Sequence, residues 1–150
     1  TRHATVAIDF LTYPGIKESD KTYLRALDHL NPTHEYGVAF ERGTRLTLDD
    51  RQTYFISGTA SIDRHGNVLY LGDVERQTHR LLDNIDALLK DGGAGLNDVK
   101  YFLIYLRDLS DRAVVEDYMR RHFPSTPFIT LLARVCRPEW LIEMECIAER

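Results

Sequence analysis

Two glutamates, Glu143 and Glu145, stand two positions apart in the C-terminal segment of the sequence. Apolar residues alternate with them over residues 140–148, which places the two acids with Leu141 and Ile147 on one face of a strand. A carboxyl group among apolar neighbours has its charged form disfavoured, so its pKa rises and it can transfer protons near neutral pH. The alternative is a solvated strand face without catalytic work.

Cys136 precedes Arg137 at the end of the preceding extended run. A neighbouring cation favours the thiolate, so Cys136 is a candidate nucleophile, and a small core residue is the alternative. We expect Cys136 and Cys146 to be unpaired, because two cysteines cannot make a disulfide framework. Residues 1–5 carry no apolar signal-peptide core, and together with the free thiols this favours a cytoplasmic location.

The six histidines lack the i, i+4 pairing of a helical metal site and have no suitable cysteine partner. We therefore predict neither a metal nor a cofactor. The segment 57–59 joins two extended runs, so it is no phosphate loop or nucleophile elbow, which both lead into a helix. Gly58 within it predicts a β-bulge where a ligand approaches the backbone, or a glycine needed only for sheet curvature.

Alternation of apolar and polar residues predicts the strands that must position these groups, at 4–11, 37–48, 52–62, 99–106, 128–136 and 140–148. The second and third would form one antiparallel hairpin, and the last two a terminal hairpin. Spacings of three and four predict helices over 19–30, 74–89 and 110–123, and the second is stopped by residues 91–93. This order describes an α+β domain in which two helices cover one face of a mixed sheet.

The run 99–106 is apolar almost throughout, so its second face is expected to lie against a partner subunit. It is interrupted by Lys100 and falls far short of the roughly 20 residues that span a membrane. A length of 150 residues and a hydrophobic share of 43% are those of one globular domain. The net charge of -4 argues against nucleic acid and anionic membranes as partners.

Several segments, taken together in their order and spacing, resemble the reactive-intermediate deaminase family, also called the Rid or YjgF-like family. The segments are 54–58, 77–78 with 82–85, 99–108 followed by 114–123, and 142–148. The resemblance implies a chorismate-mutase-like fold, a homotrimer with a barrel-like core, and three ligand clefts at the subunit interfaces. It also implies one domain over residues 1–150, with residues 1–33 as an N-terminal extension.

Family members with imine deaminase activity hydrolyse enamine or imine acids. The resemblance assigns the water-positioning glutamate to Glu143, the aromatic cleft residue to Phe40, and a backbone contact to Gly58. We expect Glu143 to face a cleft with these residues, Leu141 and Ile147, and Glu145 to pair with a basic residue.

The arginine that holds the substrate carboxylate in these enzymes is expected near Pro127 or Phe128, and neither can clamp a carboxylate. We therefore expect poor hydrolysis of simple 2-iminoacids. Arg137 or Arg42 could supply a replacement cation, although a solvated turn arginine is the expected fate of each.

The segments 57–62, 72–78 and 135–145 are also similar to the C-terminal half of chorismatases, which remove pyruvate from chorismate. In that family the glutamate matching Glu143 acts as the acid on the enol ether, and some subgroups carry a cysteine matching Cys136. Chorismatases are about twice as long as this chain, and residues 1–33 are too few to replace their N-terminal half.

The sequence thus predicts a small-metabolite-binding Rid-type domain, acting as a hydrolase on an enamine, imine or enol ether. The alternative is a metabolite sensor or scaffold without catalysis. RNA cleavage is disfavoured, because the chain is acidic and lacks a basic patch rich in aromatic residues. The catalytic candidates are Glu143 and Cys136, and the candidate substrate-binding residues are Gly58, Phe40, Arg137 and Ser57.

Overall fold

The structure is a computed structural model that describes residues 10–150, so the strand predicted over 4–11 lies almost wholly outside the described residues. The described part contains six strands, two α-helices and four short 3-10 turns. The strands are β1 (Lys21–Leu24), β2 (Gly43–Leu48), β3 (Arg51–Thr59), β4 (Val99–Leu106), β5 (Phe128–Leu132) and β6 (Ile142–Glu149). The helices are α1 (Val74–Asp91) and α2 (Arg112–His122), and the 3-10 turns are Glu18–Asp20, Thr33–Tyr36, Leu96–Asp98 and Leu109–Asp111.

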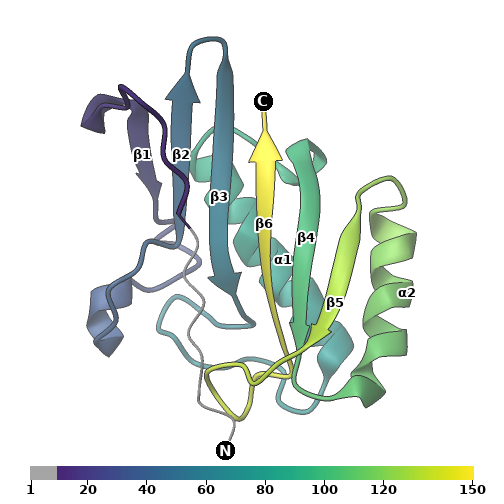
Figure 1. Cartoon of the computed structure of the whole chain (residues 1–150). Helices are drawn as coiled ribbons and strands as arrows, with labels where there is room; N and C mark the ends of the chain where they lie inside the picture. The colour runs from purple at the N-terminus through teal and green to yellow at the C-terminus, as the bar shows by residue number, and fades with distance from the viewer. Residues whose placement is uncertain (1–9) are drawn as a thin grey trace, which may run out of the picture.

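All six strands form one sheet in the order β1-β2-β3-β6-β4-β5 (Figure 1). Neighbouring strands are antiparallel, except that β4 and β5 run parallel. Parallel neighbours need a crossover connection, and α2 provides it between β4 and β5. The predicted mixed sheet of an α+β domain is confirmed.

The strand pairing confirms the first predicted hairpin and contradicts the second. β2 and β3 pair from Leu48 opposite Arg51, although β2 begins only at Gly43. β5 and β6 are not neighbours, because β4 lies between them and pairs with both. β5 ends at Leu132, so residues 133–141 form a loop that crosses the end of β4.

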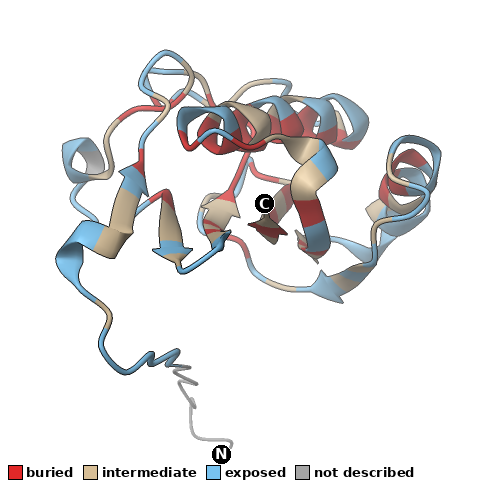
Figure 2. Cartoon of the chain, turned by 90° about the horizontal axis from the view of Figure 1, so that it is seen from above, coloured by how far each residue is buried: buried red, intermediate tan, exposed pale blue. Residues whose placement is uncertain are grey.

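Both helices cover one face of the sheet, as predicted, and leave the other face uncovered (Figure 2). Helix α1 begins at Asp73, whose side chain accepts a hydrogen bond from the backbone N–H of Arg76. Side chains of α1 spaced at three and four, from Val74 to Leu89, are buried against the sheet. No helix within residues 10–150 is both long enough and apolar enough to cross a membrane.

The helix predicted over 19–30 is wrong. After the turn at Glu18–Asp20, β1 pairs with β2 along the edge of the sheet, and the chain then bends at Ala26, which has a φ of 48°. Leu24 and Leu30 are both fully buried. The spacing of Leu24, Leu27 and Leu30 resembles a helical stripe, but Leu27 is exposed and the residues up to Leu24 pair with β2 as an extended strand.

Candidate functional site

A cavity of about 350 Å³ lies between the end of β3, the start of β6 and the loop 133–141. Its size falls within the usual range for small-molecule pockets. Most of its wall is apolar, and one carboxyl group and two guanidinium groups contribute polar atoms. The lining residues are Val38, Phe40, Arg42, Ser57, Gly58, Ala60, Ile62, Cys136, Arg137, Trp140 and Glu143.

Glu143 lies against the backbone of β3 at Gly58. The pairing of β3 with β6 shifts register between Ile56 and Thr59, which confirms the predicted β-bulge. A Cβ atom at position 58 would overlap the Oε1 atom of Glu143. Glycine thus leaves room here for the carboxyl group of Glu143, while the bulge at the same position agrees equally with a glycine needed for sheet curvature.

Burial raises the pKa of the Glu143 carboxyl, and the nearby carboxylate of Glu145 raises it further. The backbone N–H of Cys136, close to the carboxyl group, opposes this shift by favouring the charged form. The half-buried carboxyl group is thus held closer to a protonated state than an ordinary glutamate. Such a group can deliver and recover a proton near neutral pH.

Glu145 pairs with a tyrosine rather than with the basic residue that we expected. The hydroxyl group of Tyr105 on β4 donates a hydrogen bond of 2.7 Å to Oε1 of Glu145. Burial, followed by the interaction with Glu145, raises the pKa of Tyr105 to about 12. Tyr105 therefore remains a hydrogen-bond donor to Glu145 at neutral pH.

Phe40 reaches the cavity from the segment that precedes β2, and two hydroxyl groups hold that segment in place. The Ser57 Oγ donates a 2.6 Å hydrogen bond to the carbonyl oxygen of Glu41. The Thr33 Oγ1 donates a 2.9 Å hydrogen bond to the carbonyl oxygen of Phe40. Ser57 thus acts on the cavity by joining β3 to the segment that carries Phe40.

The expectation that Arg42 and Arg137 are solvated turn arginines is wrong. Arg42 is only 7% exposed, and its guanidinium donates to the carbonyl and side-chain oxygens of Asn31 at 2.8–2.9 Å. Arg137 is half-buried, donates a 2.7 Å hydrogen bond to the carbonyl of Gly66, and lies over the ring of Trp140. Both guanidinium groups are therefore built into the walls of the cavity.

Cys136 lies in the loop after β5 rather than at the end of a strand, and it is exposed. Its place in the cavity wall contradicts the alternative of a small core residue. Cys146 is buried in β6, where burial raises the pKa of its thiol to about 12. Both cysteines are free, as predicted.

Only some of the residues that we predicted for the cleft line this cavity. Gly58 and Phe40 line the cavity with Glu143, whereas Leu141 and Ile147 do not. Pro127 and Phe128, where the carboxylate-binding arginine was expected, are also absent from the lining. The carbonyl of Pro127 accepts a hydrogen bond from Phe102 at the beginning of β5. This position serves the pairing of β5 with β4.

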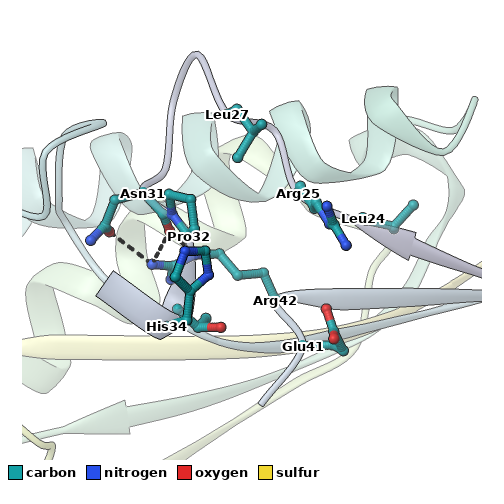
Figure 3. A pocket seen from close by; sticks show the side chains of 9 residues that line it. Leu24, Arg25, Leu27, Asn31, Pro32, His34, Glu41 and Arg42 are labelled. Atoms are coloured by element: carbon teal, nitrogen blue, oxygen red, sulfur yellow. Dashed lines mark hydrogen bonds between the residues drawn. The ribbon is translucent and has the colours of Figure 1, made fainter. Parts of the chain in front are cut away.

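A second cavity, of about 400 Å³, adjoins the first at Arg42 and is drawn in Figure 3. Figure 3 shows the hydrogen bonds from Arg42 to Asn31, with His34 beside the guanidinium group. It is larger than the first cavity, but Glu143 and Gly58 do not line it. We place the candidate site in the smaller cavity, because a carboxyl group with a raised pKa, that of Glu143, lines it.

Sequence reasoning missed the contribution of Trp140 and Val38 to the lining and the hydrogen bonds of Arg42 to Asn31. The apolar character of Val38 and Trp140 was visible in the sequence, but their place in the same cavity lining as Glu143 depends on long-range pairing. Among residues 10–150, no group of three or more metal-binding side chains is assembled.

A known protein family matches most of this chain. The profile of the family described as endoribonuclease L-PSP matches residues 39–150. This chain belongs to that family, which is the YjgF/Rid family. Its match begins after residue 38, so the assignment of residues 1–33 as an extension of a single domain stays a prediction.

Two relatives illustrate the sequence similarity. A RutC family protein of Pyrococcus horikoshii is 34% identical over 119 residues, which are 78% of this chain and 88% of the relative. The 3-aminoacrylate deaminase RutC of Acinetobacter baylyi is 29% identical over 96 residues, which are 63% of this chain and 76% of the relative.

Two solved structures support the fold. A Rid-family protein of Yersinia pestis aligns with a TM-score of 0.71 at 20% identity, covering 85% of this chain and 98% of its own. A chorismatase aligns with a TM-score of 0.76 at 24% identity, covering 85% of this chain but only 43% of its own. The YjgF-like fold is thus confirmed, and the likeness to chorismatases is one of fold alone.

Proposed function

We propose that this Rid-family chain is a hydrolase that acts on a small enamine, imine or enol ether, with Glu143 as the proton-handling group. The observation that carries the proposal is the half-buried carboxyl of Glu143, held against Gly58 in a pocket with a raised pKa. The 3-aminoacrylate deaminase among the relatives supports an enamine acid as one substrate class.

The chemistry requires one group that gives a proton and takes it back. Protonated Glu143 would deliver its proton to the β-carbon of the enamine or enol ether, which leaves an iminium or oxocarbenium ion. A water molecule would then add to the electrophilic carbon while the Glu143 carboxylate accepts a proton from it. Collapse of this adduct breaks the C–N or C–O bond and releases ammonia or an alcohol together with the carbonyl product.

The cavity walls have distinct roles in this proposal. Phe40 and Trp140 would hold the planar part of the substrate, while Arg137 or Arg42 would attract its carboxylate in place of the family's missing arginine. Gly58 would offer its backbone to the ligand, next to Ser57. Cys136 would contribute its thiol to the wall and its N–H to Glu143.

We also propose that the uncovered face of the sheet is buried in a homotrimer with a barrel-like core, so that a neighbouring subunit completes each cavity. The support is the set of half-buried apolar side chains on that face and the family resemblance. Two free thiols favour the cytoplasm as the expected compartment.

The test compares the unaltered protein with Glu143→Gln on 3-aminoacrylate, simple 2-iminoacids and chorismate. Glutamine keeps the shape of the side chain but cannot transfer a proton, so we expect turnover to fall by roughly 100-fold or more. Glu149→Gln is the control, since Glu149 lies on the same strand outside the cavity. Simple 2-iminoacids should be hydrolysed poorly, because positions 127 and 128 carry no cation to hold their carboxylate.

A metabolite sensor is the second candidate, and the missing carboxylate-binding arginine favours it. In that case no substrate of these classes would be hydrolysed, while a small carboxylic acid would still bind and protect the protein against thermal unfolding. Hydrolysis that persists at full rate in Glu143→Gln would refute the proposed mechanism.

A further inference from the structure

The loop 133–141 must cross the end of β4, because β4 separates β5 from β6. Backbone hydrogen bonds hold both ends of the crossing. The N–H of Ala133 donates to the carbonyl of Leu106, and the N–H of Arg107 donates to the carbonyl of Leu141, each at 2.9 Å. Residue 107 therefore lies inside the curve of the loop.

The side chain of Arg107 binds three carbonyl groups of this loop. Its Nε donates to Trp140 at 2.8 Å, and its Nη2 donates to Val135 at 2.9 Å and also to Arg137. The planar guanidinium offers several N–H groups in a fixed arrangement, which an ammonium group cannot reproduce. Arg107 is half-buried, so these hydrogen bonds are partly shielded from water.

Gln77 on α1 holds the far end of the same loop. Its Nε2 donates to the carbonyl of Glu139, and its Oε1 accepts from the N–H of Leu141. Both contacts of Gln77 are to residues after position 138. Of the two side chains, Arg107 is thus the one that binds the part of the loop containing Cys136.

The loop supplies one wall of the candidate site. Cys136, Arg137 and Trp140 line the cavity with Glu143, and the Cys136 N–H favours the charged form of that carboxyl. Arg107 binds the carbonyl of residue 135, which shares a peptide unit with this N–H, and the carbonyl of residue 137 on the other side of Cys136. The backbone of residue 136 is therefore held on both sides.

We propose that Arg107 is a positioning residue that aims the backbone N–H of Cys136 at Glu143 and holds the Arg137 side chain in the cavity wall. The inference rests on the proposed role of Glu143 as the proton-handling group. It goes further by assigning a function to a residue that does not line the cavity.

The readout is the ionisation of Glu143. The titratable and charged groups that face it are Glu145 on its own strand, Tyr105 opposite it on β4, Arg107 beyond Tyr105, and Arg42, Cys136 and Arg137 in the cavity wall. The backbone N–H of Cys136 stabilises the charged carboxylate. Loosening the loop lets this N–H turn away from Glu143, so the pH at which Glu143 loses its proton should rise.

The experiment measures the titration of Glu143 by the ¹³C resonance of its carboxyl carbon, which is assigned by its absence in Glu143→Gln. We expect Arg107→Lys, which keeps the charge and loses the guanidinium geometry, to raise the midpoint by roughly one pH unit. Arg107→Gln should raise it at least as much. Arg45→Lys is the matched control, because Arg45 is a half-buried arginine that binds the carbonyl of Gly92 at the other end of the sheet.

An unchanged midpoint in folded Arg107→Lys, or an equal shift in Arg45→Lys, would overturn the proposal. If both Arg107 variants fail to fold, hydrogen exchange in the unaltered protein decides, since the amide of Cys136 must then be protected although its side chain is exposed. Exchange at the rate of an unstructured peptide would refute it. A shifted midpoint without any hydrolysis refutes the proposed function alone, whereas hydrolysis without a shift refutes the role of Arg107 alone.

Discussion

Along β4 and β6, buried residues that pack under the helices alternate with half-buried or exposed residues on the opposite face. Phe102 and Met144 are 0% exposed under the helices. Leu103, which follows Phe102, and Glu143, which precedes Met144, lie on the uncovered face. Successive side chains of one strand point to opposite faces of the sheet and therefore lie in two different environments.

The two faces of the sheet differ in role: the covered face stabilises the fold, and the uncovered face carries groups that could assemble or react. On the covered face, apolar side chains meet α1 and α2 and complete the core. On the uncovered face, apolar Leu103 and Ile147 stand beside acidic Glu143 and Glu145. A surface that is both apolar and acidic fits a role in assembly and chemistry together.

The largest expected effect is on the covered face. Phe102→Ala removes a fully buried ring that packs edge to face on Phe123 with centroids 5.2 Å apart. We expect the free energy of unfolding to fall by about 3–5 kcal/mol in urea denaturation. Leu103→Ala, on the other face, should cost clearly less in dilute protein. Equal losses would mean that the two faces do not differ in the way described.

The next effect concerns assembly. Leu103→Asp places a charge on the uncovered face, and an unpaired charge in an interface is strongly unfavourable. Light scattering should show the mass of three chains for the unaltered protein and of one chain for this variant. Val114→Asp is the control, because Val114 is 41% exposed on α2, away from that face. A single-chain mass for the unaltered protein would remove the trimer.

The sequence predicted the elements better than their arrangement. The spacing along α1 and the alternation along β6 are local patterns, and both were read correctly. The order of strands is not local. Two extended runs separated by a short polar segment usually form a hairpin. Here β4 lies beside β6 instead, and α2 connects β4 to β5 on the other side of β4.

The candidate site was predictable to a similar extent. Glu143, Gly58 and Phe40 were selected from their types and from the family resemblance, and the fold brings them to one cavity. The burial of Arg42 was not predictable, because it depends on Asn31, which reaches it from a segment read as the end of a helix. The role of Arg107 depends on the loop crossing, which follows only from the strand order.

A smaller effect on catalysis is expected at the bulge. Gly58→Ala adds a Cβ atom in the space occupied by the Glu143 carboxyl, which must then move away from β3. We expect turnover to fall by roughly 10-fold, since small displacements of a proton-transferring group reduce the rate strongly. Gly15→Ala is a control for glycine replacement, because nothing lies within 4 Å of a Cβ there, although its φ of 84° costs some stability. Full activity of Gly58→Ala would show that the close approach has no function.

The smallest effect is on the pH dependence of stability, and it tests whether the uncovered face is dry. In the folded chain the pKa of Glu143 is raised above its ordinary value of 4.5 by burial and by Glu145. Its contribution to stability is therefore complete below that value and is lost as the pH rises through the folded pKa. Urea midpoints of the unaltered protein should fall relative to those of Glu143→Gln between acid and neutral pH.

Other groups with shifted pKa values, such as Asp63 and Glu116, titrate alike in both proteins and cancel in this difference. Glu149→Gln should follow the unaltered protein. Parallel curves for the unaltered protein and Glu143→Gln would mean that Glu143 is solvated. If a neighbouring subunit covers the uncovered face, desolvation increases, so the difference between the two curves should grow with protein concentration and shrink in Leu103→Asp.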